Sequence, residues 1–201
     1  MANTIKTVGV IGAGQMGNGI AHVCAVAGYD VRLNDINEDR IHAGLATVNG
    51  NMARQVAKGA IPEDIRRQAL ERIVPAPRYE DLAPCDIVIE AATENEEVKR
   101  KIFQALCPLI RPETILASNT SSISITRLAA STDRPERFIG IHFMNPVPLM
   151  QLVELIRGIA TEDPTFESAK QFINRLGKTL TVAEDFPAFI VNRILLPMIN
   201  E

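Results

Sequence analysis

The sequence predicts an α/β protein of the Rossmann type, with a doubly wound sheet that is mostly parallel. Short apolar, β-branched runs alternate with amphipathic helical runs along the whole chain. A G-x-G-x-x-G segment follows the first of these runs, and the run at 85–92 is apolar on both faces, as in a strand buried between two helix layers. Such alternation favours parallel strands joined by right-handed helical crossovers.

Each expected strand is a short apolar run, and each expected helix has an apolar stripe or clear end signals. The expected strands are 6–12, 29–35, 85–92, 114–118, 137–143, 150–156 and 178–185. The expected helices are 15–28, 37–58, 61–73, 95–110, 124–131, 164–177 and a final run from 188 to 201. Gly28 and Gly177 stand where glycine commonly ends a helix.

The composition narrows the class of protein. The chain has 201 residues, 46% of them hydrophobic, and its 21 basic and 24 acidic residues give a net charge of −3, so we expect no nucleic-acid partner. Cys24, Cys85 and Cys107 lack metal-ligand spacing, which favours buried free thiols in a reducing compartment and no metal site. No leader or membrane-spanning run is visible, so we expect a soluble cytoplasmic protein.

The loop after the first strand predicts a dinucleotide site. Gly12 permits a tight turn, Gly14 lets backbone N–H groups approach a diphosphate, and Gly17 lets the helix pack close to the strand. Asp35 ends the second strand and can accept hydrogen bonds from ribose hydroxyls, which favours NAD over NADP because a 2′-phosphate would meet a like charge. The alternative is an ordinary strand–turn–helix corner. The predicted loop comprises Gly12, Gly14, Gln15, Met16 and Gly17.

Polar residues follow the later strands, where ligands bind in sheets of this kind. Glu94 and Lys99 would lie near the nicotinamide half of the cofactor, although this segment also resembles a helix start capped by Thr93 or Asn95. The segment after the next strand is open to the same two interpretations, a ligand site or a cap for the short helix that follows. Its candidates are Asn119, Ser121 and Ser122.

His142 and Glu154 are the strongest candidates for chemistry. His142 lies at the end of one apolar strand, and Glu154 lies within the next, which is apolar on both faces. A carboxylate in such a strand needs a partner. When it bonds to one ring nitrogen of a histidine, the other ring nitrogen is left free to act as a base. The alternative is a structural histidine with an unrelated acid. Asn192, on the last helical run, needs a partner if buried, or else belongs to an exposed face with Arg193.

With these motifs together, the chain resembles the 3-hydroxyacyl-CoA dehydrogenase family over essentially its whole length. The segments that carry the resemblance are VGVIGAGQMGNGIA, DIVIEAATENEEVK, ASNTSSISIT, RFIGIHFMNPVPLMQLVELI and FIVNRILLPMINE. The resemblance implies an NAD-dependent enzyme that oxidises the L-3-hydroxyl of a 3-hydroxyacyl-CoA or runs the reverse reduction. Acetoacetyl-CoA and 3-hydroxybutyryl-CoA are the substrates that it implies.

The resemblance also implies roles for individual residues. His142 would be the general base and Glu154 its partner, while Ser121 and Asn192 would hold the oxygen at C3 of the substrate. The glycine loop, Asp35, Glu94, Lys99 and Asn119 would contact NAD. Asn51, Arg54 and Lys58 would contact the CoA moiety, on a looser match.

Two features depart from the family pattern. Ala188 stands where the family usually has glycine, and it would strain the turn before the last helix if that position has positive φ. The family continues into an all-helical, dimer-forming domain. We therefore expect an NAD-binding domain at 1–186 and the truncated start of the helical domain at 187–201, which would expose Leu195, Leu196 and Ile199, self-associate or be disordered, and turn over poorly.

Two further interpretations stay open. One is a different NAD-dependent hydroxyacid dehydrogenase on the same cofactor fold, and the other is a non-catalytic NAD-binding module. A substrate panel with and without CoA separates the first from the family activity, and cofactor titration followed by a turnover assay separates the second.

Overall fold

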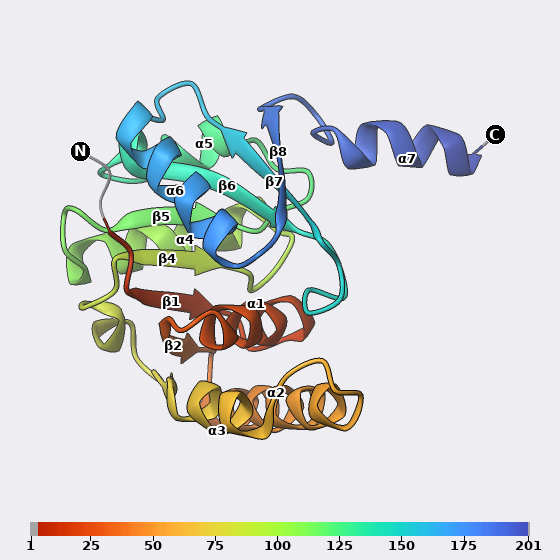
Figure 1. Cartoon of the computed structure of the whole chain (residues 1–201). Helices are drawn as coiled ribbons and strands as arrows, with labels where there is room; N and C mark the ends of the chain where they lie inside the picture. The colour runs from red at the N-terminus through yellow and green to blue at the C-terminus, as the bar shows by residue number, and fades with distance from the viewer. Residues whose placement is uncertain (1–3, 201) are drawn as a thin grey trace.

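One twisted sheet of eight strands organises the protein, whose computed structural model describes residues 4–200 (Figure 1). The strand order is β3-β2-β1-β4-β5-β6-β7-β8, parallel from β3 to β6, with β7 antiparallel to β6 and β8 parallel to β7. The strands are β1 (Thr7–Ile11), β2 (Asp30–Asn34), β3 (Ile73–Pro75), β4 (Ile87–Glu90), β5 (Ile115–Ser118), β6 (Phe138–Phe143), β7 (Leu152–Arg157) and β8 (Thr179–Glu184).

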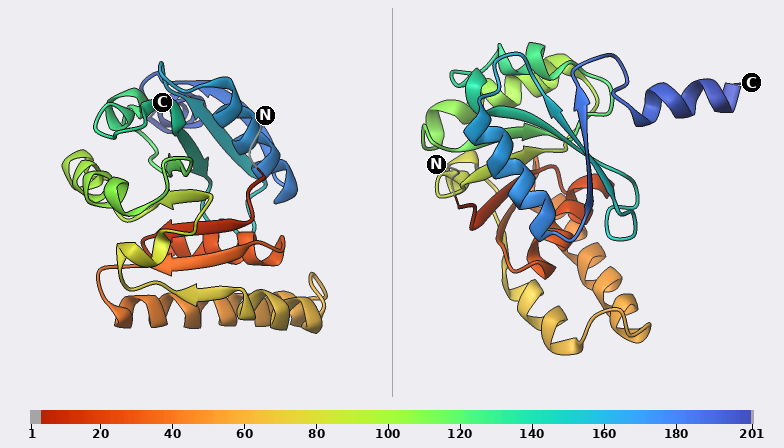
Figure 2. Two further views of the ribbon diagram at one scale, coloured as in Figure 1. Left: turned by 90° about the vertical axis from the view of Figure 1, so that its left-hand side faces the viewer. Right: turned by 45° about the horizontal axis from the view of Figure 1, so that its top comes forward.

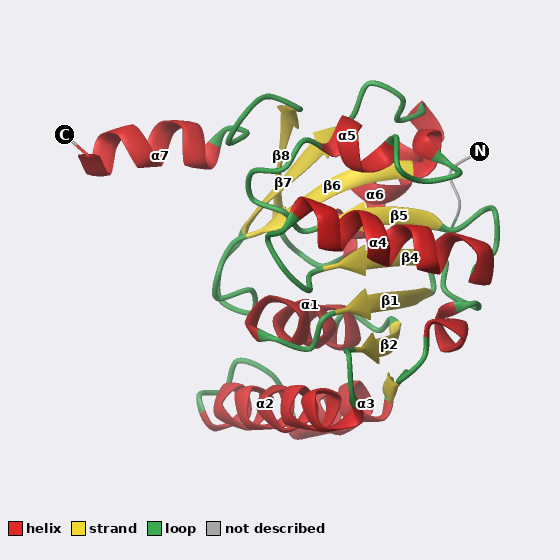
Figure 3. Ribbon diagram, turned by 180° about the vertical axis from the view of Figure 1, so that it is seen from behind, coloured by secondary structure: helices red, strands yellow, loops and turns green. Residues whose placement is uncertain are grey.

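Helices cover both faces of the sheet and enclose an apolar core on each side. The helices are α1 (Gln15–Val26), α2 (Glu38–Ala57), α3 (Glu63–Glu71), α4 (Glu96–Leu106), α5 (Ile125–Ala129), α6 (Asp163–Arg175) and α7 (Val191–Asn200). Short 3-10 turns lie at Tyr79–Leu82, Cys107–Leu109 and Pro135–Arg137. Helices α1 and α6 pack on one face and α4 and α5 on the other, as the opposite views in Figures 1 and 3 show.

The doubly wound, mostly parallel fold confirms the prediction, and each expected strand and helix is present within residues 4–200, with residue 201 of the last expected helix outside the described range. Strand β3 was not predicted, because it has three residues and ends in Pro75. Strand β7 begins at Leu152 rather than at residue 150. The N–H groups of Leu149 and Met150 instead donate to the carbonyl oxygen of Pro146, at 3.0 Å each, in a turn. Lys178 Nζ donates to the carbonyl oxygens of Val147 and Met150 at 2.7 Å each.

Helix α7 projects away from the body of the domain (Figure 2, right). Its Leu195, Leu196 and Ile199 are exposed, as expected from the sequence. The turn before it has positive φ at Ala188 (66°) and Phe189 (51°), so alanine does occupy a left-handed position here. Left-handed backbone with a Cβ is strained by about 1–2 kcal/mol.

The three cysteines are free and buried, as predicted. Within residues 4–200, no helix has both the length and the apolar character that a membrane span requires.

Candidate active site

The glycine loop joins β1 to α1 and admits only glycine at two of its positions. Gly12 has φ 101°, and a Cβ there would lie 2.7 Å from the carbonyl oxygen of Ala91. A Cβ on Gly17 would lie 1.6 Å from the carbonyl oxygen of Gly12. Gly14 is the residue before the first turn of α1, and a Cβ there would meet nothing within 4 Å. Backbone amides at a helix start with this open approach fit a diphosphate.

Three cavities adjoin this loop, and two of them also adjoin Ala92 and Thr93 after β4. The first, of about 680 Å³, lies beside Asp35 and the 3-10 turn at residues 79–82, and we call it the Asp35 cavity. The second, of about 720 Å³, contains His142 and we call it the His142 cavity. Gly14, Ala92 and Thr93 line both. A dinucleotide that crosses the loop at Gly14 would place one nucleoside half in each cavity.

Asp35 lines its cavity but also supports the glycine loop, a role that the sequence did not suggest. Its Oδ2 accepts from the Ala13 N–H at 2.7 Å, and its Oδ1 accepts from the Ile36 N–H at 2.7 Å. Arg40 Nε lies 3.2 Å from Oδ1. Since a carboxylate has about four acceptor positions, Asp35 can still accept from a ribose hydroxyl.

His142 and Glu154 lie directly opposite each other on the antiparallel strands β6 and β7. His142 Nδ1 is 2.7 Å from Glu154 Oε2, and the glutamate side chain is fully buried. Glu154 Oε1 accepts from the backbone N–H groups of Ile190 and Val191, at 2.9 Å each. A carboxylate that accepts from every partner leaves the hydrogen on Nδ1 and a free lone pair on Nε2. The pairing inferred from the sequence is therefore present.

Ser121 and Asn192 come together in the His142 cavity from distant parts of the chain. Asn192 Nδ2 donates to the carbonyl oxygen of Ser121 at 3.2 Å. The two residues and His142 line the same space. An amide nitrogen has two hydrogens, so Asn192 retains one donor for a ligand. Asn192 is half-buried, whereas Arg193 beside it is exposed.

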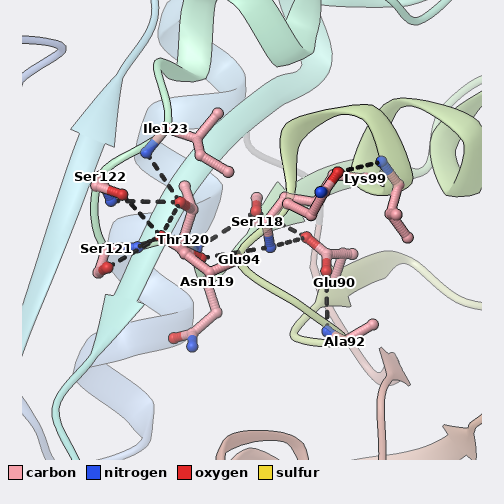
Figure 4. A network of polar contacts seen from close by, with 12 residues as sticks. Glu90, Ala92, Glu94, Lys99, Ser118, Asn119, Thr120, Ser121, Ser122 and Ile123 are labelled. Atoms are coloured by element: carbon pink, nitrogen blue, oxygen red, sulfur yellow. Dashed lines mark hydrogen bonds and ion pairs between the residues drawn. The ribbon is translucent and has the colours of Figure 1, made fainter.

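Glu94 holds the loop that carries Ser121 (Figure 4). Its Oε1 accepts from the hydroxyls of Thr120, Ser121 and Ser122 and from the Ser121 N–H, at 2.6–3.1 Å. Burial acts to raise the pKa of Glu94, but the hydrogen bonds from Thr120 and Ser121 and the charge of Lys99 outweigh it and lower the pKa below its usual value. Glu94 therefore stays a carboxylate at neutral pH.

The helix start expected after β4 is present and is capped by Asn95, one of the two residues named from the sequence. Asn95 caps α4 by accepting from the Val98 N–H, so Glu94 is free to bind the serine loop. Ser124 caps α5. The Asn119 side chain instead accepts from the Phe143 N–H at 2.9 Å, beside the histidine, and Asn119 also lines the His142 cavity.

Lys99 is almost fully buried, and its partner Glu90 was not identified from the sequence. Lys99 Nζ is 2.5 Å from Glu90 Oε2 and 3.9 Å from Glu94 Oε2. Glu90 also accepts from Ser118 Oγ at 2.9 Å and from the Ala92 N–H at 2.8 Å (Figure 4). The signal was available, because Glu90 ends the apolar run IVIE and a carboxylate in such a run needs a partner.

The three residues expected to contact CoA lie along α2 and at its C-terminal end. Asn51 and Arg54 contact each other. Asn51 lines a third cavity, of about 610 Å³, between α1, α2 and the loop before β7. Arg54 donates to the Asn51 side chain. Lys58 is exposed at the C-terminal end of the helix. In the described part of the chain, no group of side chains could hold a metal ion.

The fold and the site together define a dinucleotide-binding domain of the Rossmann type, with a histidine–carboxylate pair at the cavity beside the glycine loop. The family model for the 3-hydroxyacyl-CoA dehydrogenase NAD-binding domain matches residues 7–186. The chain belongs to this family, and its cofactor is NAD.

Individual relatives agree with this assignment. A 3-hydroxybutyryl-CoA dehydrogenase from Bradyrhizobium diazoefficiens is 70% identical over 201 residues, which is all of this chain and 69% of the relative. A probable 3-hydroxybutyryl-CoA dehydrogenase from Bacillus subtilis is 48% identical, over 98% of this chain and 69% of the relative. The crystal structure of an (S)-3-hydroxybutyryl-CoA dehydrogenase from Ralstonia eutropha superposes with a TM-score of 0.96 at 50% identity, over 98% of this chain and 70% of that one.

Proposed function

We propose that this protein interconverts an L-3-hydroxyacyl-CoA and the 3-ketoacyl-CoA, with acetoacetyl-CoA and 3-hydroxybutyryl-CoA as its substrates. NAD supplies the hydride acceptor or donor when it is bound. The observation that carries the proposal is the buried His142–Glu154 pair, with Nδ1 and Oε2 2.7 Å apart, facing the cavity that Ser121 and Asn192 share.

In the oxidation, His142 Nε2 takes the proton of the C3 hydroxyl as hydride leaves C3. Glu154 keeps Nδ1 protonated and stabilises the positive charge that the imidazole gains. The Asn192 amide, with one hydrogen still available, and Ser121 hold the C3 oxygen. In the reduction the same imidazole returns the proton to that oxygen.

The CoA moiety would lie along α2. Arg54 and Lys58 are exposed cations that suit its phosphate groups, and Asn51 adds a polar contact in the third cavity. A dehydrogenase for free hydroxyacids would have no use for these contacts. A substrate panel that compares CoA thioesters with the free acids therefore separates the two activities.

The test is NADH titration by fluorescence followed by acetoacetyl-CoA turnover. His142→Ala should lower kcat by about 10²–10⁴-fold, the usual contribution of a general base, and leave the Kd for NADH unchanged. His42→Ala, at an exposed histidine of α2, is the matched control and should change neither. Turnover that survives His142→Ala would refute the assignment of the base, and NADH binding without turnover in the wild type would favour a binding module.

We also propose that the protein self-associates through α7. Leu195, Leu196, Met198 and Ile199 are between 46% and 69% exposed along this one helix, and apolar surface of this kind favours burial against a partner. Sedimentation should show a dimer or larger species that Leu196→Glu dissociates. A monomer at all concentrations would refute the proposal.

A further inference from the structure

The ion pair between Glu90 and Lys99 lies deep in the domain, at the end of β4 and in α4. Glu90 is fully buried and Lys99 is 1% exposed. The Glu90 carboxylate accepts from three donors, Lys99 Nζ, Ser118 Oγ and the Ala92 N–H (Figure 4). Its partners come from three consecutive segments of the fold, so it joins the β4–α4 loop, helix α4 and strand β5.

Stability alone does not explain this arrangement. Taking two charges out of water costs free energy that their attraction often only offsets, and well-packed apolar residues in place of a buried pair are frequently as stable or more so. A charged pair at this position therefore points to a requirement for the charge or for the geometry that it imposes.

One carboxylate oxygen of Glu90 fixes the segment at Ala92 and Thr93 that lies between the two cofactor cavities, and we call this segment the ridge. The oxygen that binds the Ala92 N–H fixes the segment at Ala92 and Thr93, which lines both the Asp35 cavity and the His142 cavity. The same segment packs on the glycine loop, since the position of a Gly12 Cβ is 2.7 Å from the Ala92 Cα. A dinucleotide that spans both cavities must cross this ridge.

The other carboxylate oxygen of Glu90 fixes the position of the Lys99 ammonium. Although it is buried, Lys99 lines the His142 cavity, and its ammonium lies between Glu90 Oε2 at 2.5 Å and Glu94 Oε2 at 3.9 Å. Glu94 in turn holds the hydroxyl of Ser121 at 2.9 Å. Without Glu90, the ammonium would have only Glu94 as an anionic partner and would draw it away from Ser121.

We propose that Glu90 is a positioning residue for NAD. It acts through Lys99 and through the Ala92 backbone to hold the wall against which the nicotinamide half of the cofactor binds. The inference rests on the proposed function and on the placement of the cofactor across the two cavities, and it adds a residue that lines neither cavity.

The test is a double-mutant cycle on NADH affinity, with thermal stability measured in parallel. Glu90→Gln keeps an oxygen for the Ala92 N–H but removes the charge that holds Lys99. We expect the Kd for NADH to rise by about tenfold or more, the scale of one lost charged hydrogen bond. Glu90→Gln introduced into Lys99→Met should add little further loss, because the residue through which it acts is then absent. Glu97→Gln, at an exposed glutamate in the first turn of α4, is the matched control.

A variant with an apolar pair, Glu90→Leu with Lys99→Met, keeps the proposal testable if a single charge change prevents folding. We expect it to fold, with a melting temperature lowered by the loss of the acceptor for the Ala92 N–H and Ser118 Oγ, and to bind NADH about tenfold or more weakly. Wild-type NADH affinity in Glu90→Gln or in the apolar pair, with only the melting temperature altered, would overturn the inference. Failure of the wild type to bind NADH would instead refute the proposed cofactor site itself.

Discussion

Replacing Ala188 by glycine should stabilise the protein. Ala188 has φ 66°, and a residue with a Cβ costs about 1–2 kcal/mol in that region. Glycine removes this cost but makes the unfolded chain more flexible, which costs about 0.4–1 kcal/mol. With mid-range values of about 1.5 and about 0.7 kcal/mol, the net gain is about 0.8 kcal/mol, or about 2–3 °C in Tm for a chain of this size.

The turn at Ala188 leads directly into the residues that contact His142 and Glu154. Phe189, the next residue, is buried, and its ring centroid lies 6.1 Å from that of His142. The two residues after it, Ile190 and Val191, donate their N–H groups to Glu154. The backbone conformation at Ala188 therefore helps to set where α7 begins relative to the histidine–glutamate pair.

The assay is thermal unfolding of Ala188→Gly beside a matched control, Ala27→Gly. Ala27 ends α1 with φ −76°, where alanine is unstrained, so glycine there should lower stability by about 0.4–1 kcal/mol. The two substitutions make the same chemical change and should shift Tm in opposite directions. A Tm for Ala188→Gly at or below that of the wild type would refute the reasoning.

Gly17→Ala should weaken NADH binding by about tenfold or more, because its Cβ would lie 1.6 Å from the Gly12 carbonyl oxygen and overpacking of this kind costs about 1–3 kcal/mol. Asp185→Asn should lose stability at neutral pH. Burial acts to raise the pKa of Asp185, but hydrogen bonds from Thr126 and Ser124 outweigh it and lower the pKa. A lowered pKa gives stability that is present above the ordinary value of 3.8 and lost as pH falls through the lowered value, so the difference in unfolding free energy between the variant and the wild type should shrink below about pH 4.

Gly17→Ala has a matched control, and for each of the two variants one result would contradict the prediction. Gly50→Ala should leave NADH affinity unchanged, since a Cβ there meets only the Arg54 guanidinium at 3.9 Å. Normal cofactor binding by Gly17→Ala would contradict the first prediction. For Asp185→Asn, urea unfolding curves between pH 3 and pH 7 that differ from the wild type by a constant amount would contradict the second.

The sequence predicted the structure best where a single physical requirement allowed few arrangements of the residues. Alternating apolar runs predicted the layers, and a carboxylate in a doubly apolar strand required the partner that Glu154 has in His142. The same reasoning applies to Glu90, but its partner Lys99 lies on the following helix, and only the fold brings the two within 2.5 Å.

Other features depend on tertiary contacts that carry no local pattern. The support that Asp35 gives to the Ala13 amide follows from the position of β2 beside β1. The bond from Asn192 to Ser121 joins α7 to the loop after β5. Strand β3 exists because three residues pair with β2 at the sheet edge, although Pro75 lacks the N–H of a usual strand residue.

The direct opposition of His142 and Glu154 on β6 and β7 fixes one side chain relative to the other. Neighbouring backbone hydrogen bonds set the alignment, so the loop that joins the two strands can change in length or sequence without moving one residue relative to the other. The loop, whose Met144, Asn145 and Met150 line the His142 cavity, can thus reshape that cavity while the contact between His142 and Glu154 stays the same.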